Sequence, residues 1–233
     1  MANFTWIVFE GVDASGKTSC ARFTTNQLIK NNVSVQFVAE PALDIDNELK
    51  HGISKQYLQY NKGWRREIRS LLKTQDHLDD SDKLTLFLID RCVLLQYLKE
   101  NSCDIVCQDR SYISTLVYQS VYLDLPIDYL MVLNKAVFTS VFDIRPDIIF
   151  YLKTSFVEAE RRCMSRVQDM LDVKAMDKLN ILVERYDWLL GQQQLKNIDD
   201  KFDGQIVTIN TNGKTLNAVK TEIFAYVQEL IRC

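Results

Sequence analysis

Residues 11 to 18 constrain the possible folds of this chain more than any other segment. They read GVDASGKT, so two glycines five positions apart precede Lys17 and Thr18, which is the phosphate-loop pattern. Glycine permits a tight turn and a close approach of the backbone to a phosphate chain, while the N–H groups of the loop and of the following helix attract an anion. We expect Lys17 to reach the terminal phosphates of a nucleotide and the Thr18 hydroxyl to hold Mg²⁺.

The residues on either side of this loop fit a strand–loop–helix unit. Residues 4–9 (FTWIVF) are apolar, aromatic and β-branched, as in a strand that is buried on both faces. Residues 18–30 form an amphipathic helical pattern that ends in a polar Asn-Asn turn. Because the three elements follow one another without a gap, we interpret the segment as a nucleotide phosphate site.

The composition is that of an ordinary globular chain. The 233 residues are 47% apolar and 25% charged, which suits one α/β domain with a large core. A net charge of −3 gives no support to a nucleic-acid partner, because such a partner favours a basic face. No apolar run approaches the roughly 18–20 residues of a membrane span, and no charged-then-apolar leader precedes the first strand. We therefore expect a cytoplasmic protein that binds no membrane and keeps its six cysteines reduced.

Hydrophobic patterning predicts five strands that alternate with helices. Further strands are expected at 33–39, 104–108, 147–152 and 205–209. Helices are expected at 63–74, at about 79–100, from after residue 111 to about 123, at 127–142, after residue 154, at 176–195 and at 215–232. Residues 42–61 are expected to be a loop with a short helix. The alternation predicts a single α/β domain over residues 1–233, with a five-stranded parallel sheet flanked by helices and the P-loop NTPase fold.

Two charged residues directly follow the third predicted strand. Ligands of an open parallel sheet bind at the carboxyl ends of its strands, so Asp109 and Arg110 are expected beside the phosphate loop. A carboxylate in this place binds Mg²⁺ directly or through water, as the aspartate after a Walker-B strand does. The planar fork of a guanidinium matches a phosphate group. The alternative for these two residues is an ion pair on the surface at the end of a strand.

Two further groups of candidate residues are expected on helices. Arg161, Arg162 and Arg166 follow the fourth strand, and arginines close to a transferred phosphoryl group stabilise its developing charge. Their alternative is a solvated helix face that pairs with acidic neighbours. Phe87 and Arg91 lie one helical turn apart, so an aromatic ring could stack on a base while the arginine donates to a base carbonyl. Alone, such a pair is more often a core residue beside a surface residue.

Together these groups resemble the thymidylate kinase family. Residues 9–18 (FEGVDASGKT) are similar to the phosphate loop of that family, residues 86–91 (LFLIDR) to its thymine-binding segment, and residues 109–119 (DRSYISTLVYQ) to its second signature. The resemblance implies a fold like that of nucleoside monophosphate kinases, with a lid at about 155–173. It also implies a homodimer that transfers the γ-phosphoryl group of ATP to dTMP, with Mg²⁺ as cofactor.

The resemblance further implies roles for individual residues. ATP would be bound by Gly11, Val12, Asp13, Ala14, Ser15, Gly16, Lys17, Thr18 and Ser19, and Mg²⁺ by Thr18 and Asp109. The residues expected around dTMP are Asp13, Glu40, Pro41, Phe87, Arg91, Arg110, Ser114, Thr115, Tyr118 and Gln119. Among them, Phe87 would stack on thymine, Arg91 would bond its carbonyl, and Arg110 would bind the acceptor phosphate. Lys17, Arg110, Arg162 and Arg166 would be the catalytic residues.

The family has two arrangements of its catalytic arginine, in the phosphate loop or in the lid. Ala14 occupies the loop position here, so the chain resembles the lid-arginine type. Arg162 and Arg166 are the two candidates for that arginine, and the sequence leaves the choice between them open.

One departure from the family concerns the acceptor phosphate. The family has an arginine two positions before the proline that follows strand two, where this chain has Ala39, and a longer spacer follows as a helical insertion at about 42–68. A charge-assisted hydrogen bond contributes about 1.5–3 kcal/mol. We therefore hypothesise that Arg69, or else Arg65 or Arg66, supplies the missing contact.

Two rival functions remain at this stage. A deoxynucleoside kinase phosphorylates a 5′-hydroxyl and needs a general base, and that family resembles this chain at residues 151–155 (YLKTS) and at Glu40, which would be the base. A nucleotide-dependent switch needs a residue that orients water, for which Gln119 is the candidate, but the arginines of the lid would then lack a purpose. The monophosphate kinase accounts for more of the motifs than either rival.

Overall fold

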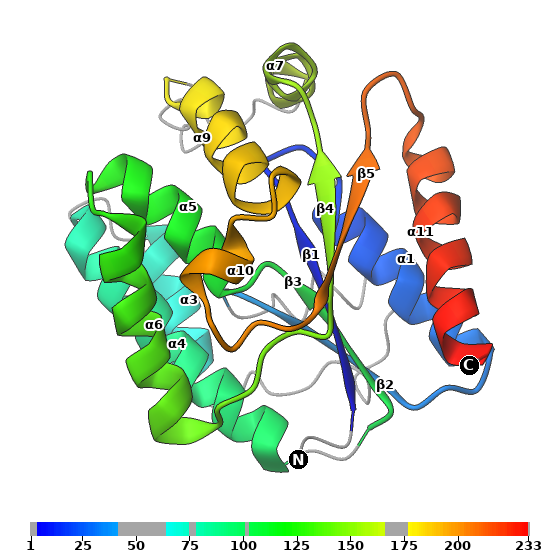
Figure 1. Ribbon diagram of the computed structural model, residues 1–233, viewed down its shortest axis with the longest axis horizontal. Coiled ribbons are helices and arrows are strands. Elements are labelled where there is room, and N and C mark those ends of the chain that lie inside the picture. Colours follow the sequence, from blue (N-terminus) through cyan, green and yellow to red (C-terminus); the bar gives the residue numbers. More distant parts are fainter. Residues whose placement is uncertain (1–3, 42–63, 75–77, 101–102, 166–176, 233) are drawn as a thin grey trace.

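The fold is built on a five-stranded parallel sheet. The computed structural model describes residues 4–41, 64–74, 78–100, 103–165 and 177–232. The strands are β1 (Thr5–Glu10), β2 (Val35–Ala39), β3 (Ile105–Asp109), β4 (Ile148–Lys153) and β5 (Gln205–Asn210), in the spatial order β2-β3-β1-β4-β5 (Figure 1). All four pairings are parallel, and the register places Phe9 between Asp109 and Phe150. The predicted fold class is confirmed.

Two helices cover one face of the sheet. These are α1 (Lys17–Lys30) and α11 (Leu216–Arg232), which pack against each other (Figure 1). Ile7 and Phe9 of β1 point into the core on this face, together with Phe37 and Phe150 of neighbouring strands. Trp6 and Val8 point into the other core, because successive side chains of a strand alternate between its faces. The apolar run of residues 4–9 is therefore a strand buried on both sides.

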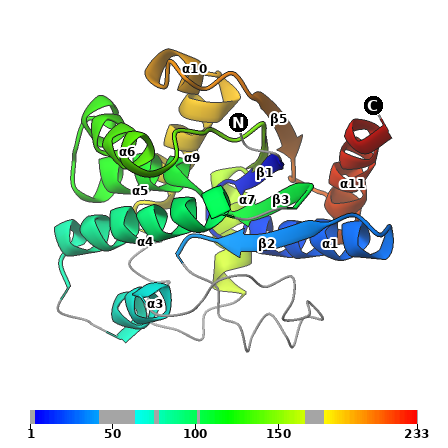
Figure 2. The ribbon, with the colours of Figure 1, turned by 90° about the horizontal axis from the view of Figure 1, so that it is seen from below.

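The opposite face carries the helices that build the site. They are α4 (Asp80–Glu100), α5 (Tyr112–Tyr122), α6 (Ile127–Val141) and α9 (Leu179–Tyr186) (Figure 1). Helix α3 (Trp64–Thr74) lies against α4 (Figure 2). Helix α7 (Phe156–Met164) follows β4 beyond the carboxyl end of the sheet (Figure 1).

The prediction of one continuous helix over residues 176–195 is wrong. Helix α9 ends at Tyr186 and continues as a short π-helix, η2 (Asp187–Gly191), before a separate helix α10 (Leu195–Ile198). Gln193 has a φ angle of +57°, which lies in the left-handed region and ends the helical path. A Cβ atom on Gly191 would lie 2.3 Å from Asp187 Oδ1, so any other residue there would displace the Asp187 side chain.

Some predictions fall partly or wholly outside the described residues. The insertion expected at about 42–68 is described only from residue 64, and the lid expected at about 155–173 only to residue 165. Cys20, Cys92, Cys103, Cys107 and Cys163 are free thiols, as predicted. Among the helices described, none is both long enough and apolar enough to cross a membrane.

Candidate active site

The phosphate loop connects β1 to α1, as predicted. Gly11 and Gly16 have φ angles of +143° and +102°, which residues with a side chain rarely adopt. A Cβ atom on Gly11 would lie 2.8 Å from the carbonyl oxygen of Leu152 at the end of β4. The loop therefore folds tightly against the neighbouring strand and leads into the amino end of α1, where the helix dipole favours an anion.

Lys17, the first residue of α1, folds back over this loop. Its side chain is 4% exposed, and Nζ donates a hydrogen bond to the carbonyl oxygen of Val12 at 2.6 Å. Burial and, to a lesser extent, the charge of Arg110 lower the pKa of Lys17 to about 8, against the attraction of nearby carboxylates. An ammonium group held this way can exchange the carbonyl oxygen for the oxygens of a bound phosphate.

Thr18 and Asp109 meet between α1 and the end of β3. The Thr18 hydroxyl donates to Asp109 Oδ2 at 2.5 Å. The other carboxylate oxygen, Oδ1, is buried and has no hydrogen-bond partner among the described residues. A buried carboxylate oxygen without a donor suits a cation, and Mg²⁺ takes oxygen ligands from one or two side chains beside phosphates. Both residues therefore fit the predicted magnesium site.

Arg110 connects the phosphate loop to the cavity beside it. Its guanidinium forms an ion pair with Asp13 of the loop and donates to Ser114 Oγ at 3.4 Å. The Tyr118 hydroxyl donates to the second oxygen of Asp13 at 2.9 Å, and the guanidinium carbon of Arg110 lies 5.2 Å from the centre of the Tyr118 ring. Burial raises the pKa of Asp13, but the charges of Arg110 and Lys17 outweigh it and lower the pKa to about 2. Asp13 is thus ionised at neutral pH and orients Arg110.

The backbone of Arg110 is also unusual. Its φ angle is +64°, in the left-handed region that side-chain-bearing residues seldom occupy. The Arg110 N–H donates to the carbonyl oxygen of Phe9 at 3.1 Å, which ties the end of β3 to β1. Such a conformation costs on the order of 1–3 kcal/mol and persists where the surrounding structure imposes it. Here it brings the guanidinium to the phosphate loop.

Glu10, the last residue of β1, is fully buried behind the loop. Its carboxylate accepts hydrogen bonds from the Ser111 N–H at 2.6 Å, the Ser114 hydroxyl at 2.8 Å and the Tyr186 hydroxyl at 3.0 Å. Burial raises the pKa of Glu10, although these hydrogen bonds and nearby cations oppose the shift. One carboxylate therefore fixes β1, the amino end of α5 and the end of α9 relative to one another.

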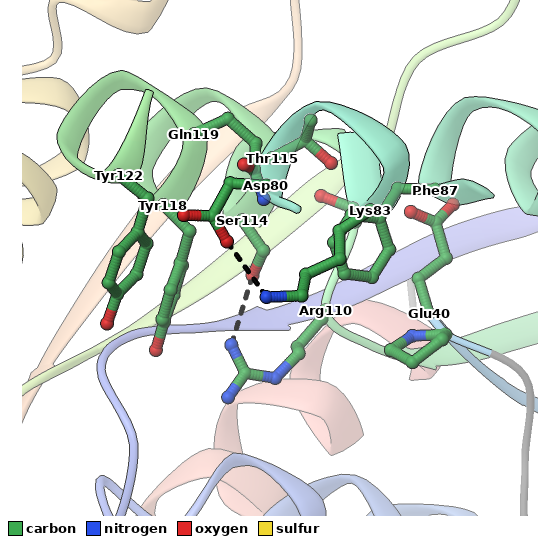
Figure 3. Close-up of a pocket in the computed structure, with 12 residues that line it drawn as sticks. Glu40, Asp80, Lys83, Phe87, Arg110, Ser114, Thr115, Tyr118, Gln119 and Tyr122 are labelled. Atoms are coloured by element: carbon green, nitrogen blue, oxygen red, sulfur yellow. Dashed lines mark hydrogen bonds and ion pairs between the residues drawn. The ribbon is translucent and has the colours of Figure 1, made fainter. Parts of the chain in front are cut away.

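A cavity of about 450 Å³ opens beside Arg110 (Figure 3). Its lining comes from the end of β2, the first turns of α4, the residues after β3, and α5: Glu40, Pro41, Asp80, Lys83, Phe87, Arg110, Ser111, Ser114, Thr115, Tyr118, Gln119 and Tyr122. The volume is typical of a small-molecule site. The amide oxygen of Gln119 is buried and has no partner among the described residues, so it can accept a hydrogen bond from a ligand. Eight of the residues expected to bind dTMP line this cavity.

Arg91 is not part of that lining. Its side chain is 2% exposed, and its Nε lies 3.2 and 3.1 Å from the two carboxylate oxygens of Glu40. The same guanidinium donates to Asn134 of α6 and, at 2.9 Å, to the Thr115 hydroxyl of α5. Arg91 thus supports two lining residues, Glu40 and Thr115, from behind. Its contact with a base carbonyl stays a prediction.

Arg162 lies at another part of the carboxyl edge. Its guanidinium donates to Glu158 at 2.7 Å and to the Thr211 carbonyl oxygen at 2.8 Å. Thr211 follows β5, so Arg162 packs against the connection between β5 and α11. Arg161 points away and is 67% exposed, paired with Glu158. Neither residue lines the cavity, and the catalytic role of Arg162 stays a prediction.

The residues proposed to compensate for Ala39 are only partly described. Arg69 on α3 donates to the carbonyl oxygen of Pro41 at 3.5 Å, so it lies at the edge of the cavity. The side chains of Arg65 and Arg66 lie outside the described part of the chain, and so does Arg166.

Sequence reasoning missed several residues of the site, namely Glu10, Asp80, Lys83, Tyr122 and Asn134. A signal existed for two of them. Glu10 immediately precedes Gly11 at the end of a strand, and Lys83 precedes Phe87 by one helical turn. Asn134 belongs to a helix whose sequence gives no indication of a contact with α4.

Comparison with known proteins gives consistent matches. The family model described as thymidylate kinase matches residues 59–223. A probable thymidylate kinase of Methanocaldococcus jannaschii is 25% identical over 99% of both chains. A thymidylate kinase of Prochlorococcus marinus (strain NATL1A) is 30% identical over 94% of this chain and 95% of its own. A probable thymidylate kinase of Sulfurisphaera tokodaii is 31% identical over 67% of each chain.

Proposed function

The chain belongs to the thymidylate kinase family and is therefore an ATP-dependent nucleoside monophosphate kinase, and from this premise we propose how its site phosphorylates dTMP. The phosphate loop, residues 11–19, binds ATP. The cavity beside Arg110 binds dTMP. The γ-phosphoryl group passes from ATP to the 5′-phosphate of dTMP, which yields ADP and dTDP.

One observation carries this assignment of the two subsites. Arg110 lines the cavity and at the same time forms an ion pair with Asp13 of the phosphate loop. A phosphoryl group that moves from a nucleotide on the loop to an acceptor in the cavity must pass this guanidinium. Arginine is suited to the position because its planar fork binds two phosphate oxygens at once.

The chemistry requires positioning and charge neutralisation more than covalent help. The acceptor oxygen of a nucleoside monophosphate is already an anion, so no general base has to remove a proton. Lys17 exchanges the Val12 carbonyl oxygen for phosphate oxygens of ATP, and Arg110 holds the acceptor phosphate. Mg²⁺, when held by Thr18 and Asp109, would neutralise charge on the ATP phosphates. Arg162 or Arg166 would neutralise the charge that develops on the transferred group.

The base end of the cavity has the chemistry to recognise a pyrimidine. Phe87 offers an aromatic face on which the base can stack. The buried amide oxygen of Gln119 can accept a hydrogen bond from the ring N–H of thymine. The pairing of Arg91 with Glu40 holds this end of the cavity rigid.

Release of ADP, measured with a panel of acceptors, tests the proposal. We expect turnover with dTMP and little with thymidine, no turnover in Lys17→Ala, and turnover like that of the wild type in Lys30→Ala, which removes an exposed lysine from the other end of α1. Preferred phosphorylation of thymidine would instead make Glu40 the general base of a nucleoside kinase. Slow ATP hydrolysis that no acceptor accelerates would point to a nucleotide switch.

We further propose that the enzyme is a cytoplasmic homodimer. Helices α4 and α6 pack against each other and expose apolar side chains, with Ile89 44%, Tyr129 51% and Val132 61% exposed. Burial of such side chains against a second copy would stabilise a dimer. Light scattering after size exclusion would give twice the mass of the chain, and Val132→Arg would give the single mass.

A further inference from the structure

Resting on the proposed function, we propose that Lys83 is a second phosphate-binding residue of the acceptor cavity. Its ammonium group leaves Asp80 when a nucleoside monophosphate enters, and it then binds the acceptor phosphate together with Arg110. The ligand class is a phosphate monoester on a nucleoside. No motif of the sequence analysis includes either Lys83 or Asp80.

The position of Lys83 supports this role. It lies in the first turns of α4, one turn before Phe87, and its side chain lines the cavity with that of Arg110. Figure 3 draws Lys83 among the lining residues, with its ammonium group paired to Asp80 and, in this view, beside the hydrogen bond from Arg110 to Ser114. Phe87 follows Lys83 by one helical turn and lines the same cavity, so the ring on which a base could stack shares its lining with both cations.

Three cations in or directly behind the lining, Arg91, Arg110 and Lys83, are each paired with a carboxylate, and the pairs differ in how readily they can be exchanged. Arg91 and Glu40 form a pair whose side chains are 2% and 7% exposed, and Arg91 has further hydrogen bonds. Lys83 and Asp80 form a pair at 2.9 Å, with side chains 38% and 37% exposed. A solvated pair three residues apart on one helix contributes little to stability, so its cation is easily transferred to a stronger partner.

The charge of the ligand requires a second cation. A phosphate monoester has a second pKa near 6, so it carries nearly two negative charges at neutral pH. Arg110 already shares its charge with Asp13, which is ionised because its pKa is lowered to about 2. Lys83 supplies a further positive charge from the same lining, and its flexible stem lets the ammonium group follow the phosphate.

The experiment compares the binding of dTMP with that of thymidine, which has the same base and sugar but no phosphate. Isothermal titration calorimetry gives both dissociation constants for the wild type, Lys83→Met, Lys83→Arg and Asp80→Asn. We expect Lys83→Met to raise the Kd for dTMP about tenfold to hundredfold, the range of one charge-assisted hydrogen bond, and to change the Kd for thymidine less than twofold. Lys83→Arg should retain most of the affinity for dTMP.

Asp80→Asn distinguishes two explanations for weaker dTMP binding in Lys83→Met, namely loss of a phosphate contact and loss of the ion pair with Asp80. It breaks the same ion pair but keeps the lysine. We expect this variant to bind dTMP more tightly, by up to about threefold, since the ammonium no longer has to leave a carboxylate. Equal weakening of dTMP binding in Asp80→Asn and Lys83→Met would overturn the proposal, as would equal weakening of dTMP and thymidine in Lys83→Met. Lys135→Met, which loses a pair with Asp200 at 2.6 Å outside the cavity, is the matched control.

The two proposals fail in different ways. If the wild type neither binds nor phosphorylates dTMP, the proposed function is wrong. If the wild type phosphorylates dTMP and Lys83→Met leaves the Kd for dTMP unchanged, only the role of Lys83 is wrong.

Discussion

The two ends of the site are built in different ways. The donor end is a contiguous loop, residues 11–18, whose shape depends on glycine backbone angles and on the neighbouring carbonyl of Leu152. The acceptor end is assembled from β2, α4, α5 and α6, which side-chain pairs such as that of Arg91 with Glu40 connect across long stretches of chain. A local motif fixes the first end, whereas the second depends on the packing of distant elements.

Substitutions at the two ends should therefore change different properties, the catalytic rate at the donor end and the stability of the fold at the acceptor end. At the donor end Lys17 is held by a backbone carbonyl oxygen, so removing its charge should change catalysis and leave the fold intact. At the acceptor end Arg91 is itself part of the packing between helices, so removing it should change stability first. The variants below test whether the separation holds.

The largest expected effect is on rate at the donor end. Lys17→Met removes the buried ammonium that we propose binds the ATP phosphates, and we expect kcat to fall at least about 10³-fold with dTMP. The circular dichroism spectrum should match that of the wild type, because the Gly11 and Gly16 backbone keeps the loop in place. Activity within tenfold of the wild type would remove Lys17 from the mechanism.

The sheet and the donor end at its edge were predicted well from the sequence. All five strands lie within two residues of their predicted bounds, because apolar runs buried on both faces give a strong local signal. Thr18 and Asp109, predicted from motif and strand end, meet at 2.5 Å. Such features depend on a few neighbouring residues.

At the acceptor end sequence reasoning found most of the lining residues but not the contacts that hold them in place. Phe87, Arg110 and Gln119 line the cavity as expected, whereas Arg91 pairs with Glu40 behind it. The pattern of α4 alone cannot distinguish the two outcomes, because the partners of Arg91 come from β2, α5 and α6. The break after η2 was missed for a similar reason, since a left-handed Gln193 has no sequence signal of its own.

The next effect is on stability at the acceptor end. Arg91→Met removes one partner of a buried ion pair, and we expect the free energy of unfolding to fall by about 3–5 kcal/mol. The double variant Arg91→Met with Glu40→Leu should recover much of this loss, because it replaces both members of the pair with apolar side chains. Unfolding in urea measures both variants. A loss below about 1 kcal/mol in Arg91→Met, accompanied by a higher KM for dTMP, would instead make Arg91 a ligand of the base.

A smaller effect is expected at the predicted magnesium site. Asp109→Asn removes the buried carboxylate that faces Thr18, and we expect the Mg²⁺ concentration for half-maximal rate to rise about tenfold to hundredfold. Titration of Mg²⁺ at saturating ATP and dTMP gives this value. Asp104→Asn, at an exposed carboxylate before the other end of β3, serves as the control and should leave the titration unchanged. An unchanged Mg²⁺ requirement in Asp109→Asn would place the metal elsewhere.

The smallest effect concerns the loss of folding stability that results from burying the charged Lys17 side chain at the donor end. Burial lowers the pKa of Lys17 from 10.5 to about 8, so between these values the unfolded chain binds more protons and stability rises with pH. The destabilisation is complete below about pH 8 and disappears toward pH 10.5. Lys17→Met should therefore be more stable than the wild type at pH 7, by on the order of 1–3 kcal/mol, with the difference shrinking by pH 10. With saturating ATP and Mg²⁺ at pH 7 the wild type should instead be more stable than Lys17→Met, because bound phosphates stabilise the charged ammonium group of Lys17. Equal stability of the two proteins at both pH values would mean that Lys17 is not strained by burial, and the donor end would then resemble the acceptor end in holding its cation by satisfied pairs.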